Sequence, residues 1–144
     1  MIEIRRQALV PYAPGQMFDL VNDVEAYPSR FSWCSGAHVI ERQGDAELTA
    51  RLELSLAGIH HGFTTRNTLD RPRRLRVQLV EGPLKTLDGD WHFDALGDEG
   101  CRVRLELDFE VSGRLTGAAL RLGFQVLAGR MVDDFCAVAR KVYG

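Results

Sequence analysis

The sequence predicts an α+β fold in which a curved antiparallel sheet of about seven strands wraps around a long C-terminal helix. Over residues 36–111, apolar and polar residues alternate with period two and turn residues recur regularly, which is typical of antiparallel strands. The C-terminal segment instead carries apolar residues at spacings of three and four, which is typical of an α-helix. Because a twisted sheet curves over its apolar face, we expect the helix to fill the concave side.

The N-terminal segment predicts one strand and then one or two short helices. Ile2–Val10 has the composition of a strand, and Pro11 ends it. Pro14 suits the first turn of a helix, where its missing N–H is not needed. Residues 25–28 form a turn or a second small helix. The buried face of the first helix should consist of Met17, Phe18, Leu20, Val21 and Val24.

The middle of the chain predicts six further strands, separated by turns at residues 57–62, 70–73, 82–83 and 97–100. The strongest alternation runs from Cys101 to Val111, and Ser112 and Gly113 should lead into the final helix. The inward positions of the earlier strands are Leu48, Ala50, Leu52, Leu54 and Leu56, then Leu75, Val77 and Leu79, then Leu87, Gly89, Trp91, Phe93 and Ala95.

The final helix carries more apolar surface than one packed face needs. A second row, made of Leu115, Ala119, Leu122 and Val126, falls on nearly the opposite side of its first half. This row predicts contact with a lipid in a cavity, a membrane or a partner, unless loops of the chain cover it. The main row, which should face the sheet, contains Leu120, Phe124, Leu127, Met131, Phe135, Val138 and Val142.

Length, charge and cysteine content narrow the function classes. With 144 residues, we expect a single domain over residues 1–144 that buries its own core. The net charge of −2 gives no overall attraction to nucleic acid or anionic lipid, so we expect no DNA binding, and other anionic partners need a local patch. Three cysteines without a C-x-x-C pair, no apolar leader and no apolar run of membrane-spanning length predict a cytoplasmic protein, with a place at the periphery of the inner membrane left open.

Short motifs along essentially the whole chain carry a family resemblance. They are ALVPYAP at 8–14, MFDLVNDVEAYP at 17–28, WC at 33–34, FTTRN at 63–67, the Gly-Pro at 82–83 with Lys85, Gly89, Trp91 and Phe93, and DFE at 108–110. In this order they resemble the START-like coenzyme Q-binding family, whose members are often labelled oligoketide cyclase/lipid transport proteins. The resemblance implies a START-like helix-grip fold, a hydrophobic cavity and binding of ubiquinone or a related isoprenoid lipid.

The same resemblance implies two alternative functions. The bacterial branch of the family includes ribosome association toxins, which implies binding to the large ribosomal subunit and blocking of subunit association. The cyclase label implies an aromatic or polyketide cyclase. Two departures from the family pattern fall where a pocket mouth is expected: Arg30-Phe31-Ser32 replaces an aromatic-Leu-Pro run, and Leu84 replaces Phe.

No arrangement in the sequence is typical of catalysis or metal binding. His60 and His61 are adjacent, so on a strand they point to opposite faces and cannot share a metal ion. Cys101 lies on an inward phase, and no G-x-S-x-G motif occurs. Asp88 and Asp90 lie on an outward phase, where burial cannot raise the pKa of a general acid. We therefore expect no enzyme activity, no catalytic residue, no metal and no cofactor.

Inward side chains predict a ligand site between sheet and helix. Thr65 and Asn67 share the inward phase of Phe63, and Glu81 shares that of Leu79, so polar groups should point into an apolar hollow. They could bond each other or orient a ligand's carbonyl or methoxy groups. The expected ligand-binding residues are Trp33, Leu54, Phe63, Thr65, Asn67, Leu79, Trp91, Phe93, Phe109, Phe124, Leu127, Met131 and Phe135.

Basic residues predict two docking surfaces. Four arginines cluster at residues 71–76, either as a phosphate site or as a solvated turn. Arg114, Arg121 and Leu122 of the final helix combine charge with apolar surface, which favours docking to a membrane or a ribosome. The leading hypothesis is non-enzymatic binding of ubiquinone or a related isoprenoid in support of respiratory electron transport. The large ribosomal subunit and a transient membrane-surface contact are the alternative partners.

Overall fold

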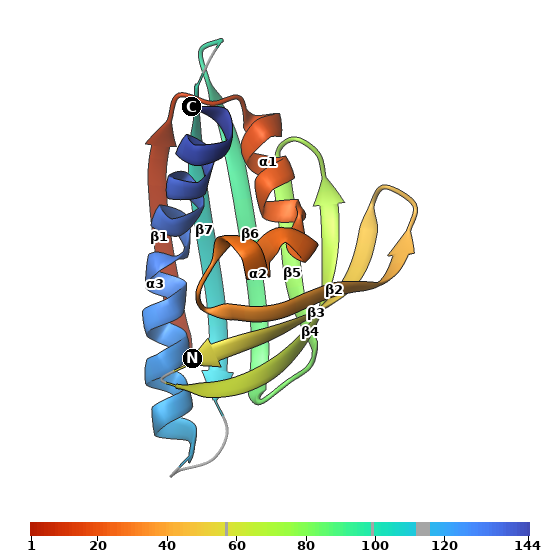
Figure 1. The fold of residues 1–144 in the computed structure, drawn as a ribbon, viewed down its shortest axis with the longest axis vertical. Helices are drawn as coiled ribbons and strands as arrows, with labels where there is room; N and C mark the ends of the chain where they lie inside the picture. Colours follow the sequence, from red (N-terminus) through yellow and green to blue (C-terminus); the bar gives the residue numbers. More distant parts are fainter. Residues whose placement is uncertain (57, 99, 112–115) are drawn as a thin grey trace.

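The computed structural model describes residues 1–56, 58–98, 100–111 and 116–144, and it confirms the expected α+β architecture (Figure 1). Seven antiparallel strands form one sheet in the order β1-β7-β6-β5-β4-β3-β2. The sheet curls around the long helix α3, and the short helices α1 and α2 cover the rest of its concave side (Figure 1). The strands are β1 Ile2–Val10, β2 Cys34–Gln43, β3 Glu47–Leu56, β4 Ile59–Asp70, β5 Arg74–Glu81, β6 Leu84–Leu96 and β7 Gly100–Val111.

The helices follow the capping and packing signals in the sequence. Helix α1 spans Pro14–Asn22, and Gln16 Oε1 accepts a hydrogen bond of 2.9 Å from the backbone N–H of Ala13 at its start. A short 3-10 helix η1, Val24–Ala26, leads into α2, Tyr27–Arg30. Helix α3 spans Thr116–Tyr143. The five inner residues expected for the first helix are all buried.

Cross-strand ion pairs neutralise much of the charge on the outer face of the sheet. Arg74 Nε lies 2.7 Å from Asp90 Oδ1, and Arg76 Nη2 lies 3.0 Å from Asp88 Oδ2. Similar pairs join β1 to β7, β3 to β4 and β6 to β7. Arg71 donates two hydrogen bonds to the carboxylate of Asp19 on α1. Three of the four arginines at residues 71–76 are therefore paired, which makes that cluster a poor phosphate site.

Two strand positions expected to point inward are exposed instead. Ala95 lies near the end of the β6–β7 hairpin, which projects beyond the helices (Figure 1). Glu81 is displaced by a bulge, because Thr64 pairs with Glu81 while the next residue, Thr65, pairs with Leu79. The extra residue reverses the phase of the strand, so Glu81 lies on the outer face, away from the hollow.

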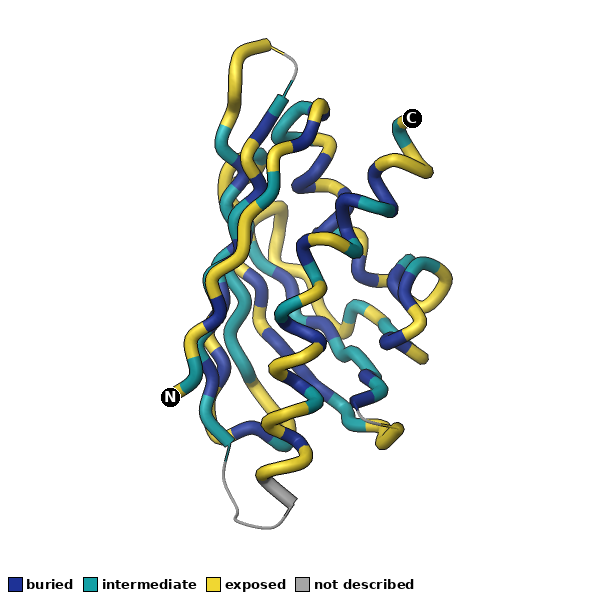
Figure 2. The backbone as a smooth tube through the Cα atoms, turned by 90° about the vertical axis from the view of Figure 1, so that its left-hand side faces the viewer, coloured by how far each residue is buried: buried dark blue, intermediate teal, exposed yellow. Residues whose placement is uncertain are grey.

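Helix α3 leaves its second apolar row uncovered over the described residues. Leu122 is 64% exposed and Val126 is 59% exposed, and Figure 2 shows exposed bands alternating with buried ones along the helix. Val142, expected in the packed row, is 49% exposed. Arg114 and Leu115 lie outside the described residues. No helix in the described ranges is long and apolar enough to span a bilayer.

Candidate functional site

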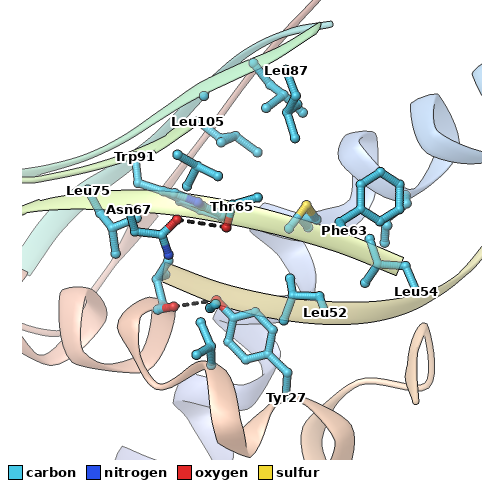
Figure 3. A pocket seen from close by; sticks show the side chains of 18 of the residues that line it. Tyr27, Leu52, Leu54, Phe63, Thr65, Asn67, Leu75, Leu87, Trp91 and Leu105 are labelled. Carbon is cyan, nitrogen blue, oxygen red and sulfur yellow. Dashed lines mark hydrogen bonds between the residues drawn. The ribbon is translucent and has the colours of Figure 1, made fainter. Parts of the chain in front are cut away.

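A cavity of about 90 Å³ lies between the sheet and α3. Its wall is almost entirely apolar and combines side chains from β3 to β7, α1, α2 and α3 (Figure 3). The hollow expected from the sequence is therefore present. Nine of the expected ligand-binding residues line it: Trp33, Leu54, Phe63, Thr65, Asn67, Trp91, Phe124, Leu127 and Met131.

The other four expected ligand-binding residues do not line the cavity. Phe93, Phe109 and Phe135 are at most 1% exposed and pack within the core. Leu79 is half-buried and lies by the β5–β6 hairpin. These residues share the inward phase of the cavity residues, but their positions along the strands and the helix place them in packed regions. Their placement does not support a ligand-binding role.

One polar pair faces the cavity. Thr65 Oγ1 donates a hydrogen bond of 3.0 Å to Asn67 Oδ1, and both side chains are buried (Figure 3). Asn67 Nδ2 has no acceptor among the residues that the structure describes. An amide presents two donors as well as an acceptor, so this nitrogen can donate to a carbonyl or ether oxygen of a guest molecule.

Tyr27 closes the cavity on the side of α1 and α2. Its hydroxyl donates a hydrogen bond to the backbone carbonyl of Val21, and burial raises its pKa well above the ordinary value for tyrosine (Figure 3). The phenol is therefore a structural donor that stays protonated. In the sequence analysis Tyr27 stands only within the family motif at 17–28, because no apolar periodicity assigns it to an inner face.

An aromatic cluster joins the cavity wall to α3. Phe31 stacks on Trp33 with ring centroids 4.6 Å apart, and Phe135 of α3 lies 4.7 Å from Phe31 and 5.2 Å from Trp91. Offset or edge-on aromatic pairs of this kind add stability beyond simple burial. The cluster fixes the position of α3 against α2 and thereby sets the size of the hollow.

Several further wall residues were expected to point inward but not to bind a ligand. Gly89 is one of them. A Cβ at this position would lie 2.7 Å from Leu107 Cδ1, so the absence of a side chain leaves room for Leu107 on the neighbouring strand. The others are Val21, Val24, Ala50, Leu52, Leu75, Val77, Leu87, Leu105 and Leu107. Alternation along a strand identifies the inner face but does not show which part of that face borders an empty space.

The volume limits what the cavity holds without rearrangement. An engineered cavity of about 150 Å³ in another protein accepts benzene, so about 90 Å³ admits only a smaller group. Leu52, Val77 and Met131 are the lining residues with intermediate exposure. Methionine is unbranched and adapts its shape readily, so Met131 is the wall residue best suited to move aside for a larger guest.

The described part of the chain offers no metal-binding cluster, and the described cavity wall carries no carboxylate or imidazole. No group of three or more His, Cys, Asp or Glu side chains lies close enough together there to hold a metal ion. Burial raises the pKa of the Cys34 and Cys136 thiols, and raises that of Cys101 to about 11, so all three stay protonated at neutral pH. None of the described residues lining the cavity is an ordinary acid or base.

Comparison with known proteins adds the family context. Residues 10–136 match the family described as polyketide cyclase/dehydrase and lipid transport. The chain is 42% identical over 143 residues to the ribosome association toxin RatA of Escherichia coli strain K12, covering 99% of this chain and 90% of that relative. A START superfamily protein from Mycobacterium smegmatis superposes with a TM-score of 0.83 at 16% identity, over 97% of this chain and 98% of that one.

An enzyme shares the same fold. The Zhui aromatase/cyclase from a Streptomyces species superposes with a TM-score of 0.87 over 99% of this chain and 96% of that chain, at 17% identity. Identities this low show a common fold alone and carry no information about chemistry. The expected START-like fold is therefore confirmed, while the fold alone does not choose between a binding protein and a cyclase.

Proposed function

This chain belongs to the polyketide cyclase/dehydrase and lipid transport family, and from that premise we propose that it associates with the ribosome, as the name of its E. coli relative states for that protein. The observation that carries the proposal is the similarity to that relative, which is 42% identity over 99% of this chain and 90% of the relative. We infer that the partner is the large ribosomal subunit and that binding there blocks its association with the small subunit.

The geometry supports binding without catalysis. A cyclase needs a positioned acid or base next to its substrate. The described cavity wall offers only Thr65, Asn67, Tyr27 and Trp33 as polar groups, and burial raises the pKa of Tyr27 far beyond the neutral range. We therefore propose that the protein acts through its surface and its cavity as a binding protein, not as an enzyme.

Sedimentation with purified ribosomal subunits tests the main proposal. The protein should pellet with large subunits and not with small ones, and adding it to separated subunits should lower the fraction that joins into complete ribosomes. The small subunit is the matched control, because it also presents RNA phosphates. Equal pelleting with both subunits, or no pelleting with either, would contradict the proposal.

A second function, binding of an apolar ligand, is favoured by the cavity itself. Its wall is apolar except for a buried pair that leaves Asn67 Nδ2 without an acceptor in the described chain. A ubiquinone or related isoprenoid would place a ring oxygen near this donor and bury its tail, gaining about 25 cal/mol per Å² of apolar surface. Such a ligand has to displace wall residues, of which Met131 is the most adaptable.

Two measurements test ligand binding. Organic extraction and mass spectrometry of the purified protein should recover an isoprenoid, and a short-chain ubiquinone should quench tryptophan fluorescence with saturation, since Trp33 and Trp91 both line the cavity. An Ala50→Val variant, which narrows the cavity, is the matched control and should respond more weakly. An empty extract together with unsaturable quenching would contradict this second function.

A further inference from the structure

A shallow groove of about 130 Å³ lies between the α2–β2 connection and the C-terminal half of α3. Three basic side chains line it, Arg30 from α2 and Arg130 and Lys141 from α3, together with a single acidic one, Asp134. The α2–β2 connection reaches α3 at this place (Figure 1). The groove is separate from the apolar cavity, and only Trp33 belongs to the walls of both.

Packing holds the groove in place. The indole Nε1 of Trp33 donates a hydrogen bond of 2.9 Å to Asp134 Oδ2, and Arg130 Nε donates another of 2.9 Å to the same oxygen. Phe31, which is 5% exposed, anchors the connection by stacking on Trp33. The groove therefore has a rigid floor and a defined position for the Arg130 guanidinium.

The charge at the groove is positive and partly unpaired. Asp134 is shared by Arg130 and Trp33, so it does not neutralise the other two cations. Within the described chain, Lys141 forms no ion pair, and Arg30 contacts one carboxylate, with Nη1 at 3.4 Å from Asp23 Oδ2 in a geometry that makes no hydrogen bond. Lys141 is exposed and the Arg30 side chain keeps 24% of its surface exposed, so both cations can approach an external acceptor.

Seven of the thirteen other arginines in the described chain are already paired with carboxylates. On the sheet, Arg5, Arg66, Arg74, Arg76 and Arg104 pair with acidic side chains of neighbouring strands. Since the net charge of the protein is −2, attraction to a polyanion depends on a local excess of cations. The groove provides that excess on a rigid surface.

We propose that this groove binds phosphate groups of ribosomal RNA, with Arg30, Arg130 and Lys141 as the contacting side chains. Guanidinium and ammonium groups bind phosphate oxygens through charge-assisted hydrogen bonds, and such contacts position a protein on nucleic acid without reading its sequence. The assignment rests on the proposed ribosome association and names the surface through which it occurs. It is a different surface from the outer row of α3, whose docking role stays a prediction.

A pair of neighbouring charge reversals tests the assignment. Lys141→Glu removes a groove cation, whereas Arg140→Glu makes the same change in charge one residue earlier, at an exposed position outside the groove. Affinity for large ribosomal subunits is measured between 50 and 200 mM salt. Losing one phosphate contact, as in Lys141→Gln, should weaken binding about eightfold near 0.1 M salt and reduce the slope of log affinity against log salt by about one. Lys141→Glu should weaken binding further, because the new carboxylate repels the phosphate. Arg140→Glu should bind like the unmodified protein.

The outcomes separate the two proposals. If the unmodified protein binds large subunits and both variants bind equally well, the groove assignment is wrong and ribosome association stands. If the unmodified protein does not bind at all, both fail. A milder Lys141→Gln variant should show an intermediate loss, and unchanged circular dichroism excludes misfolding. Vesicles of phosphatidylglycerol and phosphatidylethanolamine provide the last arm: if Lys141→Glu lowers vesicle binding and leaves ribosome binding unchanged, the partner is a membrane and the RNA assignment is overturned.

Discussion

Replacing Ala50 with valine should stabilise the protein, because the side chain of Ala50 faces the empty cavity. Ala50 is 1% exposed, lies on β3 and lines the void of about 90 Å³. At about 24 cal/mol per Å³ of unfilled space, a void of this size corresponds to roughly 2 kcal/mol of lost packing energy. Valine adds two carbon atoms at about 0.8 kcal/mol each when buried, and it is also favoured in strands.

The expected gain is therefore about 1–2 kcal/mol in the free energy of unfolding, or about 2–8 °C in Tm. Urea denaturation and calorimetry measure it, with Ala37→Val as the control. Ala37 lies on the neighbouring strand β2, is half-buried and does not line the cavity, so valine there should change stability by less than about 0.5 kcal/mol. A loss of 1 kcal/mol or more for Ala50→Val, with an unchanged denaturant slope, would refute the reasoning, because it would mean that the site has no room.

Three further predictions concern titratable and polar groups. Burial raises the pKa of Cys101 to about 11, so between pH 9 and 11 the unfolded chain loses a proton that the folded chain keeps. The free energy of unfolding should therefore fall over this range, and urea melts of Cys101→Val should show a smaller fall. The hydrogen bond from Arg104 lowers the pKa of Asp94, so its contribution to stability is present above pH 4 and lost on further acidification; Asp94→Asn should flatten that part of the pH profile. Asn67→Leu leaves the Thr65 hydroxyl without its acceptor, which should cost about 1–3 kcal/mol in urea melts and abolish saturable ubiquinone quenching.

Residue patterns predict the fold well where one face of an element meets water. Along β7 every second residue from Cys101 to Phe109 is buried, as the alternation requires. The prediction fails where a local irregularity changes the phase, as the bulge between β4 and β5 does for Glu81. It also fails at Ala95, where a hairpin extends past the helices that would cover it. Both failures depend on the positions of other elements, which periodicity along one strand does not contain.

The sequence predicts which residues point inward but not which of them border the cavity. Phe93 and Trp91 lie two residues apart on one strand and share a phase, yet only Trp91 borders the void. Which inner residue lines a cavity depends on the mismatch in curvature between the sheet and α3, a property of the whole assembly. The basic groove is harder still, because Arg30 and Lys141 come from distant segments and no local pattern links them.

The cavity and the groove share the side chain of Trp33, which links the two proposed binding functions within one domain. The ring of Trp33 lines the cavity, while its Nε1 holds the carboxylate of Asp134 that also orients Arg130. A guest large enough to displace this ring has to bend or break the bond to Asp134, which frees Arg130 from its fixed position. Conversely, a phosphate that draws Arg130 away leaves Asp134 bound to Trp33 alone. Since α3 forms part of both walls, the two proposed sites share a helix as well as a side chain, so the proposed ligand binding and the proposed ribosome association are compatible in one domain.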